Sequence, residues 1–416
     1  MSNRLKLLTI SDHPLCSSGV ANQTKYFVEG LLSTGKYTVR SLGAAMKHAS
    51  YQPQRVQEWG DNWIILPIDG YGDENMMREI LDTEKPDAVW VMTDIRFYEW
   101  LFNMSDEIRD RGIPLFYQHV WDNFPVPTFN KNVYHSCDFI GCISKLTHDI
   151  VCELGMKEHC QYIPHAVNKD VFRPLSVEKI KQKKANALGD AKDKFVIFYN
   201  SRNARRKMTS DVVKIFKQFL DKHGDVAFLL MHTDPKDREG ANLIEVAKML
   251  DIKPHQLAFS NARVPPEDIA SMYNIADVTM NISNNEGWGL SVLESLMCAT
   301  PVIANFTGGM RDQIVDKNGF EFGVAVKPVT RSLTGSQQIP FIFDDRCSDE
   351  DLLAALEKIY AMPDKERKEL GMKARERCLR DFSLEDMVNK WDKAIVKYVN
   401  QFKEKGYPER VRVAVI

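Results

Sequence analysis

The most informative stretch of the sequence is a glycine-flanked turn between an apolar run and a segment of helical period. Its letters, EGWGLSVLES, begin at Glu286 and place a second glutamate, Glu294, eight residues later. Glycines at such a turn let the backbone approach a ligand closely, and the free N–H groups of a helix start favour an anion such as a diphosphate. The two carboxylates can accept hydrogen bonds from the hydroxyls of a ribose or hexose. We therefore expect this turn to bind a molecule that carries both phosphate and sugar groups.

A second candidate for anion binding is the basic cluster RNARRK, residues 202–207, which directly follows the apolar run 195–200. If that run is the first strand of a parallel sheet, the cluster lies at the carboxyl end, where ligands bind in such sheets. Arginine and lysine there suit the charge of a diphosphate. A solvated charged surface is the alternative explanation of the same letters.

Short apolar runs alternate with longer segments of helical period, which is typical of an α/β protein with parallel sheets. In the first half we predict strands at 5–10, 37–42, 63–68, 88–92, 115–119, 139–144 and 161–167. In the second half we predict strands at 195–200, 226–232, 257–260, 278–282 and 302–306. The segment 324–347 fits no clear element and is expected to be a loop insertion, and from Asp349 onward only helical periods appear.

The domain organisation follows from length and from one change in composition. A chain of 416 residues is too long for one ordinary core and suits two α/β domains. The polar, lysine-rich stretch 168–193 separates the two sets of strands, so we expect domains at 1–180 and 181–385. A last long helix, 386–416, is expected to pack back on the first domain. Hinges at 168–193 and at the start of that helix would let the domains close over a ligand.

Several segments together resemble glycosyltransferase family 4. EGWGLSVLESLMCATPVIA is similar to that family's signature EGxGLxxxEAxAxGxPVIA, and YNSRNARRK is similar to its GRxxxxK loop. ARVPPEDIASMYNIADVTMNIS resembles the segment that frames the nucleotide base. In the first half, SSGVANQTKYFVEGL, LFYQHVWDN and IPHAVNKDVFRP resemble the glycine-rich loop, the strand-end histidine and the hinge of the family. The resemblance runs from Ile10 to about Trp391, and its most specific motifs lie in the second half.

The resemblance implies a GT-B fold, in which two Rossmann-like, doubly wound domains face each other across a cleft. It also implies an enzyme that transfers a sugar from a nucleoside diphosphate to an acceptor hydroxyl with retention of stereochemistry. Glu286 would hold the donor sugar, His119 would orient it from the opposite domain, and Glu294 would bind the ribose. The implied catalytic residues are His119, Glu286, Arg202 and Lys207. The implied donor-binding residues are Gly19, Val264, Gly287, Trp288, Gly289, Leu290, Ser291 and Glu294.

The donor implied is a UDP- or GDP-sugar, used without a cofactor. Arg202, Lys207 and the helix start would stabilise the charge on the leaving phosphate, so no metal is expected to do that work. The eight cysteines form no CxxC pair and no Cys/His spacing suited to zinc, and we expect reduced thiols and no metal site. No signal peptide or membrane span is recognisable, so a cytoplasmic protein is expected.

The acceptor is left open by the sequence. A glycan or small molecule is the default for the family, and a hydroxymethylated DNA base is the alternative. The chain has 55 basic and 57 acidic residues, and residues 1–173 contain 17 basic against 22 acidic ones, which disfavours binding to a phosphate backbone. A catalytically idle nucleotide-sugar binder is an alternative from another class. Retention of both glutamates and of the basic cluster argues against it.

Overall fold

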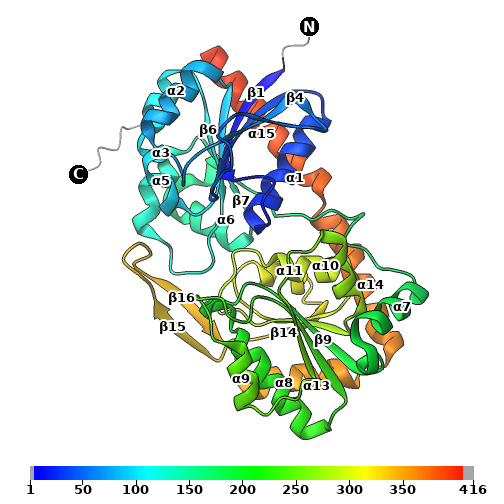
Figure 1. Cartoon of the computed structure of the whole chain (residues 1–416). Helices are drawn as coiled ribbons and strands as arrows, with labels where there is room; N and C mark the ends of the chain where they lie inside the picture. The colour runs from blue at the N-terminus through cyan, green and yellow to red at the C-terminus, as the bar shows by residue number, and fades with distance from the viewer. Residues whose placement is uncertain (1–3, 406–416) are drawn as a thin grey trace. The chain divides into compact units, whose positions relative to one another are not determined.

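The computed structural model describes residues 4–405, which divide into two compact units (Figure 1). The first unit contains the chain up to Ala166, the short piece Gly335–Phe341 and the chain from Leu384 onward. The second unit contains Val167–Thr334 and Ile342–Ser383. The lysine-rich stretch 168–193, where the sequence suggested the boundary, therefore lies within the second unit, and residues Val177–Leu188 of it form a helix there.

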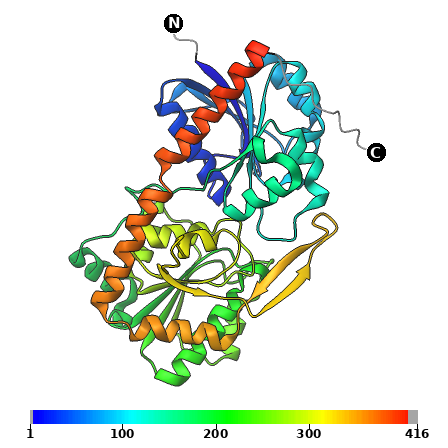
Figure 2. The same ribbon diagram turned by 180° about the vertical axis from the view of Figure 1, so that it is seen from behind.

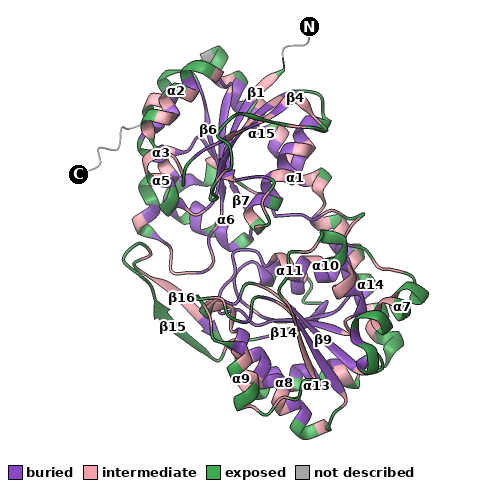
Figure 3. Cartoon of the chain, in the orientation of Figure 1, coloured by how far each residue is buried: buried purple, intermediate pink, exposed green. Residues whose placement is uncertain are grey.

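The first unit is built on an eight-stranded sheet in the order β3-β4-β2-β1-β5-β6-β7-β8. Its strands are β1 (Leu5–Asp12), β2 (Tyr37–Ala44), β3 (Gln54–Val56), β4 (Gly60–Pro67), β5 (Ala88–Met92), β6 (Leu115–His119), β7 (Phe139–Cys142) and β8 (Cys160–Tyr162). All neighbours pair in parallel except β3, an exposed edge strand that the sequence analysis missed. Parallel strands are covered on both faces, and β5, β6 and β7 are accordingly buried at every residue (Figure 3).

The helices of the first unit include the last helix of the chain (Figure 2). They are α1 (Gly19–Ser33), α2 (Glu74–Glu84), α3 (Glu99–Asn103), α4 (Ser105–Asp110), α5 (Lys131–Ser136), α6 (Lys145–Val151) and α15 (Leu384–Lys405). Trp391 of α15 is fully buried, with its ring edge-on to those of Phe27, Trp90 and Phe139. Its Nε1 donates to Gln118 Oε1 at 2.7 Å, so the one polar atom of the ring is also satisfied. The C-terminal helix thus completes the core of the N-terminal sheet.

The second unit is built on a six-stranded parallel sheet in the order β11-β10-β9-β12-β13-β14. Its strands are β9 (Phe195–Asn200), β10 (Ala227–His232), β11 (Leu257–Ser260), β12 (Val278–Asn281), β13 (Val302–Asn305) and β14 (Gly323–Val326), with β15 (Thr330–Thr334) and β16 (Ile342–Arg346) as an antiparallel pair beside it. Its helices are α7 (Val177–Leu188), α8 (Thr209–His223), α9 (Leu243–Met249), α10 (Pro266–Ile275), α11 (Leu290–Met297), α12 (Met310–Ile314), α13 (Asp349–Ala361) and α14 (Asp364–Asp381).

The segment 324–347 is not the loop insertion that the sequence suggested. It contains the last strand of the sheet and both strands of the antiparallel pair. Every residue of β15 is exposed and most are polar, so the alternation of apolar and polar residues that reveals a half-buried strand is missing from its letters.

The order of the strands determines where a ligand should bind in the second unit. The chain lays down β9, β10 and β11 in one direction and then crosses back to place β12 on the other side of β9. In doubly wound sheets, ligands bind at the carboxyl ends of the strands where the order reverses. Here that place is between the loops that follow β9 and β12, which contain the basic cluster and the glycine-flanked turn.

None of the helices within residues 4–405 combines the length and the apolarity that crossing a bilayer requires.

Gly141 in β7 provides the space that the Trp391 ring fills. A Cβ at this position would lie 2.3 Å from Trp391 Cζ2, which is far below a normal contact. We expect Gly141→Ala to lower the free energy of unfolding of the first unit by about 1–3 kcal/mol. In a Trp391→Leu background Gly141→Ala should lower the free energy of unfolding far less, because the ring that the new methyl group would contact is absent. Denaturant unfolding of the four proteins measures both costs, and equal costs in the two backgrounds would contradict the contact.

Candidate functional site

The turn between β12 and α11 is shaped by glycine. Gly289 is the N-cap of α11 and has a φ of 87°, which side-chain-bearing residues rarely adopt. A Cβ there would also lie 2.8 Å from Met310 Cγ. Because this N-cap has no side chain, α11 begins without a side-chain cap, and its first N–H groups suit an anion.

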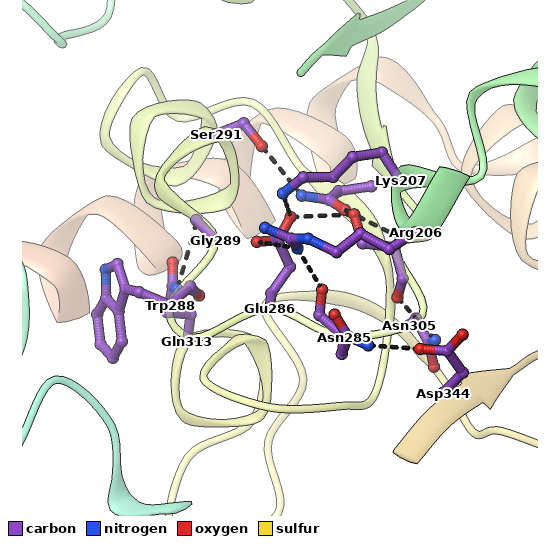
Figure 4. A network of polar contacts seen from close by, with 12 residues as sticks. Arg206, Lys207, Asn285, Glu286, Trp288, Gly289, Ser291, Asn305, Gln313 and Asp344 are labelled. Carbon is purple, nitrogen blue, oxygen red and sulfur yellow. Dashed lines mark hydrogen bonds and ion pairs between the residues drawn. The ribbon is translucent and has the colours of Figure 1, made fainter. Parts of the chain in front are cut away.

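Glu286 stands at this turn and is surrounded by positive charge (Figure 4). It forms an ion pair with Lys207 through Oε1, and Arg206 Nη1 lies 3.5 Å from its Oε2. Ser283 Oγ donates to Oε1 at 3.0 Å. The carboxylate is only 7% exposed, and burial alone would raise its pKa. The charges of Lys207 and Arg206 outweigh burial and lower the pKa of Glu286 to about 2, so the group is ionised.

Hydrogen bonds to main-chain carbonyl groups hold the two loops of this cluster together. Asn284 N donates to Arg206 O at 2.8 Å, and Arg206 Nη1 donates to Asn285 O at 2.8 Å. The loop after β9 ends in a short 3₁₀ turn, Arg205–Lys207, followed by Met208 in the left-handed conformation. This geometry turns Arg206 and Lys207 toward the loop after β12.

Glu294 lies inside the first turns of α11 and has neutral partners. Tyr273 Oη donates to its Oε2 at 2.8 Å, and Asn200 Nδ2 lies 3.4 Å from the same oxygen. Burial raises the pKa of Glu294 to about 7, and the Tyr273 hydrogen bond offsets this only in part. Asn200 ends β9, so this carboxylate also belongs to the carboxyl end of the sheet.

The other predicted residues of the second unit have different surroundings. Ser291 Oγ accepts from Asn281 Nδ2 at 3.0 Å at the start of α11. The Trp288 ring is buried edge-on against Phe382 and points away from Glu286, so it packs in the interior (Figure 4). Val264 is half-buried in the loop after β11. Gly287 lies in the turn, and Leu290 is the first residue of α11.

Arg202 is not brought into the Glu286 cluster. Its guanidinium makes two hydrogen bonds with Asp237, at 2.7 and 3.1 Å, and its side chain is 65% exposed. The resemblance selected Arg202 by its five-residue spacing from Lys207, whereas the structure places Arg206 beside Glu286. Both arginines belong to the same basic cluster of the sequence. The 3₁₀ turn Arg205–Lys207 contains Arg206 and directs it toward Glu286, whereas Arg202 precedes this turn.

His119 and Gly19 belong to the first unit. His119 ends β6 and is fully buried, with Nε2 2.9 Å from Tyr134 Oη. Burial lowers its pKa to about 3, so the imidazole is neutral. Gly19 is the exposed first residue of α1, and Ser18, where the family usually has a second glycine, caps that helix by accepting from Ala21 N at 3.0 Å. The donor contacts that the resemblance gives these two residues stay predictions.

The sequence analysis missed a second glycine loop that supports the turn. Gly309 N donates to Glu286 O at 2.9 Å, and a Cβ at Gly309 would lie 2.3 Å from Gly287 O. The adjacent Gly308 has a φ of 50°. The letters TGG in the same stretch as the glutamates are the signal that could have found this loop. Two asparagines were missed as well: Asn305 Nδ2 donates to Ser283 O at 2.9 Å, and Asn285 Nδ2 donates to Asp344 Oδ1 at 2.6 Å.

The chain is similar in sequence to known glycosyltransferases. Residues 180–377 match the family described as glycosyl transferases group 1. The D-inositol 3-phosphate glycosyltransferase of Corynebacterium jeikeium is 28% identical over 153 residues, which are 36% of either chain. The alpha-monoglucosyldiacylglycerol synthase of Acholeplasma laidlawii is 26% identical over 199 residues, 46% of this chain and 48% of that protein. The matches thus span about half or less of these relatives.

Solved structures extend the similarity of fold to nearly the whole chain. HepE of Anabaena in complex with UDP and glucose superposes with a TM-score of 0.68 at 12% identity, covering 95% of this chain and 100% of that one. Sucrose-phosphate synthase of Thermosynechococcus elongatus gives a TM-score of 0.72 at 16% identity, covering 95% and 99%. Residues 180–377 thus match the group 1 glycosyl transferases, in agreement with the resemblance to glycosyltransferase family 4, and the two doubly wound units have the GT-B fold.

Proposed function

We propose that the protein is a retaining glycosyltransferase that moves a sugar from a nucleoside diphosphate to an acceptor hydroxyl. The observation that carries this proposal is the ionised Glu286 between Lys207 and Arg206, beside the start of α11 and at the reversal of strand order. The donor we favour is a UDP-sugar, which is supported by the similarity of fold to HepE, a protein with UDP and glucose in its structure.

In this proposal the charges of the cluster are divided between sugar and phosphate. Arg206, Lys207 and the first N–H groups of α11 bind the diphosphate oxygens, and the Glu286 carboxylate accepts from sugar hydroxyls. The bond between the anomeric carbon and the phosphate oxygen breaks, and the acceptor oxygen bonds to that carbon on the same face. The acceptor proton passes to the leaving phosphate oxygen. Positive groups placed where this negative charge develops lower the barrier.

We further propose that transfer needs no divalent metal. Two side-chain cations and a helix start lie at one place, and together they supply the charge stabilisation that Mg²⁺ gives in other phosphate-transfer sites.

For the acceptor we propose a glycan or a small molecule. The relatives are named for inositol 3-phosphate and for monoglucosyldiacylglycerol, and the excess of acidic residues in the first 173 positions disfavours a DNA backbone. A hydroxymethylated DNA base is the alternative acceptor.

The direct test of the function is release of nucleoside diphosphate from a panel of nucleotide sugars. Each donor is incubated with glycan, lipid, inositol phosphate or hydroxymethylcytosine-DNA acceptors, with and without added Mg²⁺. We expect UDP release that depends on an acceptor other than DNA and that does not depend on Mg²⁺. Tight UDP binding without any acceptor-dependent release would support an idle nucleotide-sugar binder and overturn the proposed activity.

The two arginines of the basic cluster provide a matched pair of variants. Arg206→Ala should lower turnover by about 10²- to 10³-fold, because a cation aimed at the leaving phosphate is lost. Arg202→Ala removes only an exposed ion pair with Asp237 and should leave turnover close to that of the wild type. Steady-state kinetics of both variants decide the assignment. The opposite order of effects would return the phosphate contact to Arg202.

Glu294 makes the affinity for the nucleoside diphosphate depend on pH. Ribose hydroxyls donate to a carboxylate, so affinity should rise as pH increases through about 7, the pKa to which burial raises this group. Glu294→Gln should weaken binding at pH 8 by about ten- to a hundredfold and remove the dependence on pH. Calorimetric titration of UDP between pH 5.5 and 8 measures this, and parallel profiles for both proteins would exclude the contact.

The same pKa shift has a consequence of opposite sign for folding. The folded chain holds the Glu294 proton over a range, from about 4.5 to about 7, in which the unfolded chain has released it. The free energy of unfolding should therefore fall as pH rises through this range, and Glu294→Gln should remove that part of the fall. Thermal melts across the same pH series provide this control.

A further inference from the structure

Three side chains that prefer soft metals lie together in the first unit. His148, Cys152 and Cys160 each offer one ligand atom, and these atoms all lie within 4.8 Å of one another. All three residues are half-buried, so the group is close to the surface of the unit. None of them belongs to the donor site proposed above.

The local fold explains why these three residues meet. A capping box of Ser144 and Thr147 begins α6, and His148 and Cys152, four residues apart, lie on one face of the helical segment. The helix then widens into a π turn, Cys152–Met156, in which Gly155 has a φ of 92°. The chain reverses there and returns with Cys160 as the first residue of β8. The spacing between the two cysteines is set by this turn and matches no short zinc motif.

The distances within the group match those of a tetrahedral metal site. Cys152 Sγ lies 3.7 Å from Cys160 Sγ, and 3.8 and 3.7 Å from His148 Nδ1 and Nε2. With Zn–S near 2.3 Å and Zn–N near 2.0 Å, the edges of a tetrahedron are about 3.7 Å between two sulfurs and about 3.5 Å between sulfur and nitrogen. The three ligand atoms are therefore close enough to one another to share one ion.

A further sulfur lies beside one member of this group, although it is not among the three atoms that lie within 4.8 Å of one another. Cys142 is the buried last residue of β7, and its thiol hydrogen-bonds that of Cys160. The strands pair in parallel with Ile140 opposite Cys160, so Cys142 and Cys160 lie on the same face of the sheet as diagonal neighbours. Three cysteines and one histidine make up a familiar ligand set of structural zinc sites.

We propose that His148, Cys152 and Cys160 bind one zinc ion, and that the neighbouring Cys142 thiol moves toward them to become the fourth ligand. Binding releases the thiol protons to solvent, because thiolates are the ligands. The ion would tie the end of α6 to the edge strand β8 and to its neighbour β7. It would stabilise the first unit and take no part in sugar transfer, so this site is independent of the function proposed above.

The test uses the full chain, reduced and freed of metal with a chelator that is then removed. Titration with Co²⁺ should give the thiolate charge-transfer and tetrahedral d–d absorption bands with one equivalent per chain, and Zn²⁺ should abolish them. Cys152→Ser and Cys160→Ser should each weaken Co²⁺ binding by at least about tenfold. Cys347→Ser, a half-buried thiol of the second unit, is the matched control and should bind as the wild type does.

Thermal melts give a second measurement. Zn²⁺ should raise the melting temperature of the wild type and not that of the Cys152→Ser/Cys160→Ser double variant. If a serine variant does not fold, His148→Ala leaves all three thiols in place and should still weaken binding. The proposal is overturned if reduced wild type takes up no metal or if the variants bind as it does. A Cys152–Cys160 disulfide that persists in reductant and excludes metal would also overturn it.

Discussion

An ionised carboxylate cannot be buried at the end of a parallel sheet unless positive charge is buried with it. Glu286 meets this requirement through Lys207 and Arg206, which come from a different loop, so the two loops at the reversal of strand order depend on each other. The main-chain bond between Asn284 and Arg206 and the close approach of Gly309 to Gly287 hold that arrangement in place. The ion pairs of Glu286 with Lys207 and Arg206 thus link the two loops of the second unit before any ligand is bound. A diphosphate that bound here would meet cations already paired with a carboxylate.

The two glutamates differ because their neighbours differ. Glu286 has cations within reach, and its pKa falls to about 2, whereas Glu294 is surrounded by the neutral Tyr273 and Asn200, and its pKa rises to about 7. Both lie at the same end of the same sheet. One carboxylate is therefore charged under all ordinary conditions and the other responds to pH near neutrality, although the residue type is the same.

Much of the fold could be predicted from the sequence, because strands buried on both faces consist of continuous apolar runs. β5, β6, β9 and β11 have the predicted bounds, and the glycine turn lies between a strand and a helix as predicted. The strand that was predicted wrongly has a local cause, because β15 is exposed on every residue. Which arginine lies beside Glu286 depends on the 3₁₀ turn at Arg205–Lys207, and the sequence pattern does not specify that turn. The thiol cluster was hidden for a related reason. Cys152 and Cys160 come close only because the chain reverses at the π turn that contains Gly155, and no short sequence motif predicts this reversal.

The placement of α15 bears on the order in which the chain acquires structure during synthesis. The sheet of the first unit is translated before the second unit, whereas the helix that carries Trp391 into its core is translated after it. The second unit, Val167–Thr334 and Ile342–Ser383, is complete in sequence before α15 has been made. Domains generally fold as units as they emerge. The apolar surface of the N-terminal sheet around Phe27, Trp90 and Phe139 therefore stays without its covering helix until the second unit has been translated.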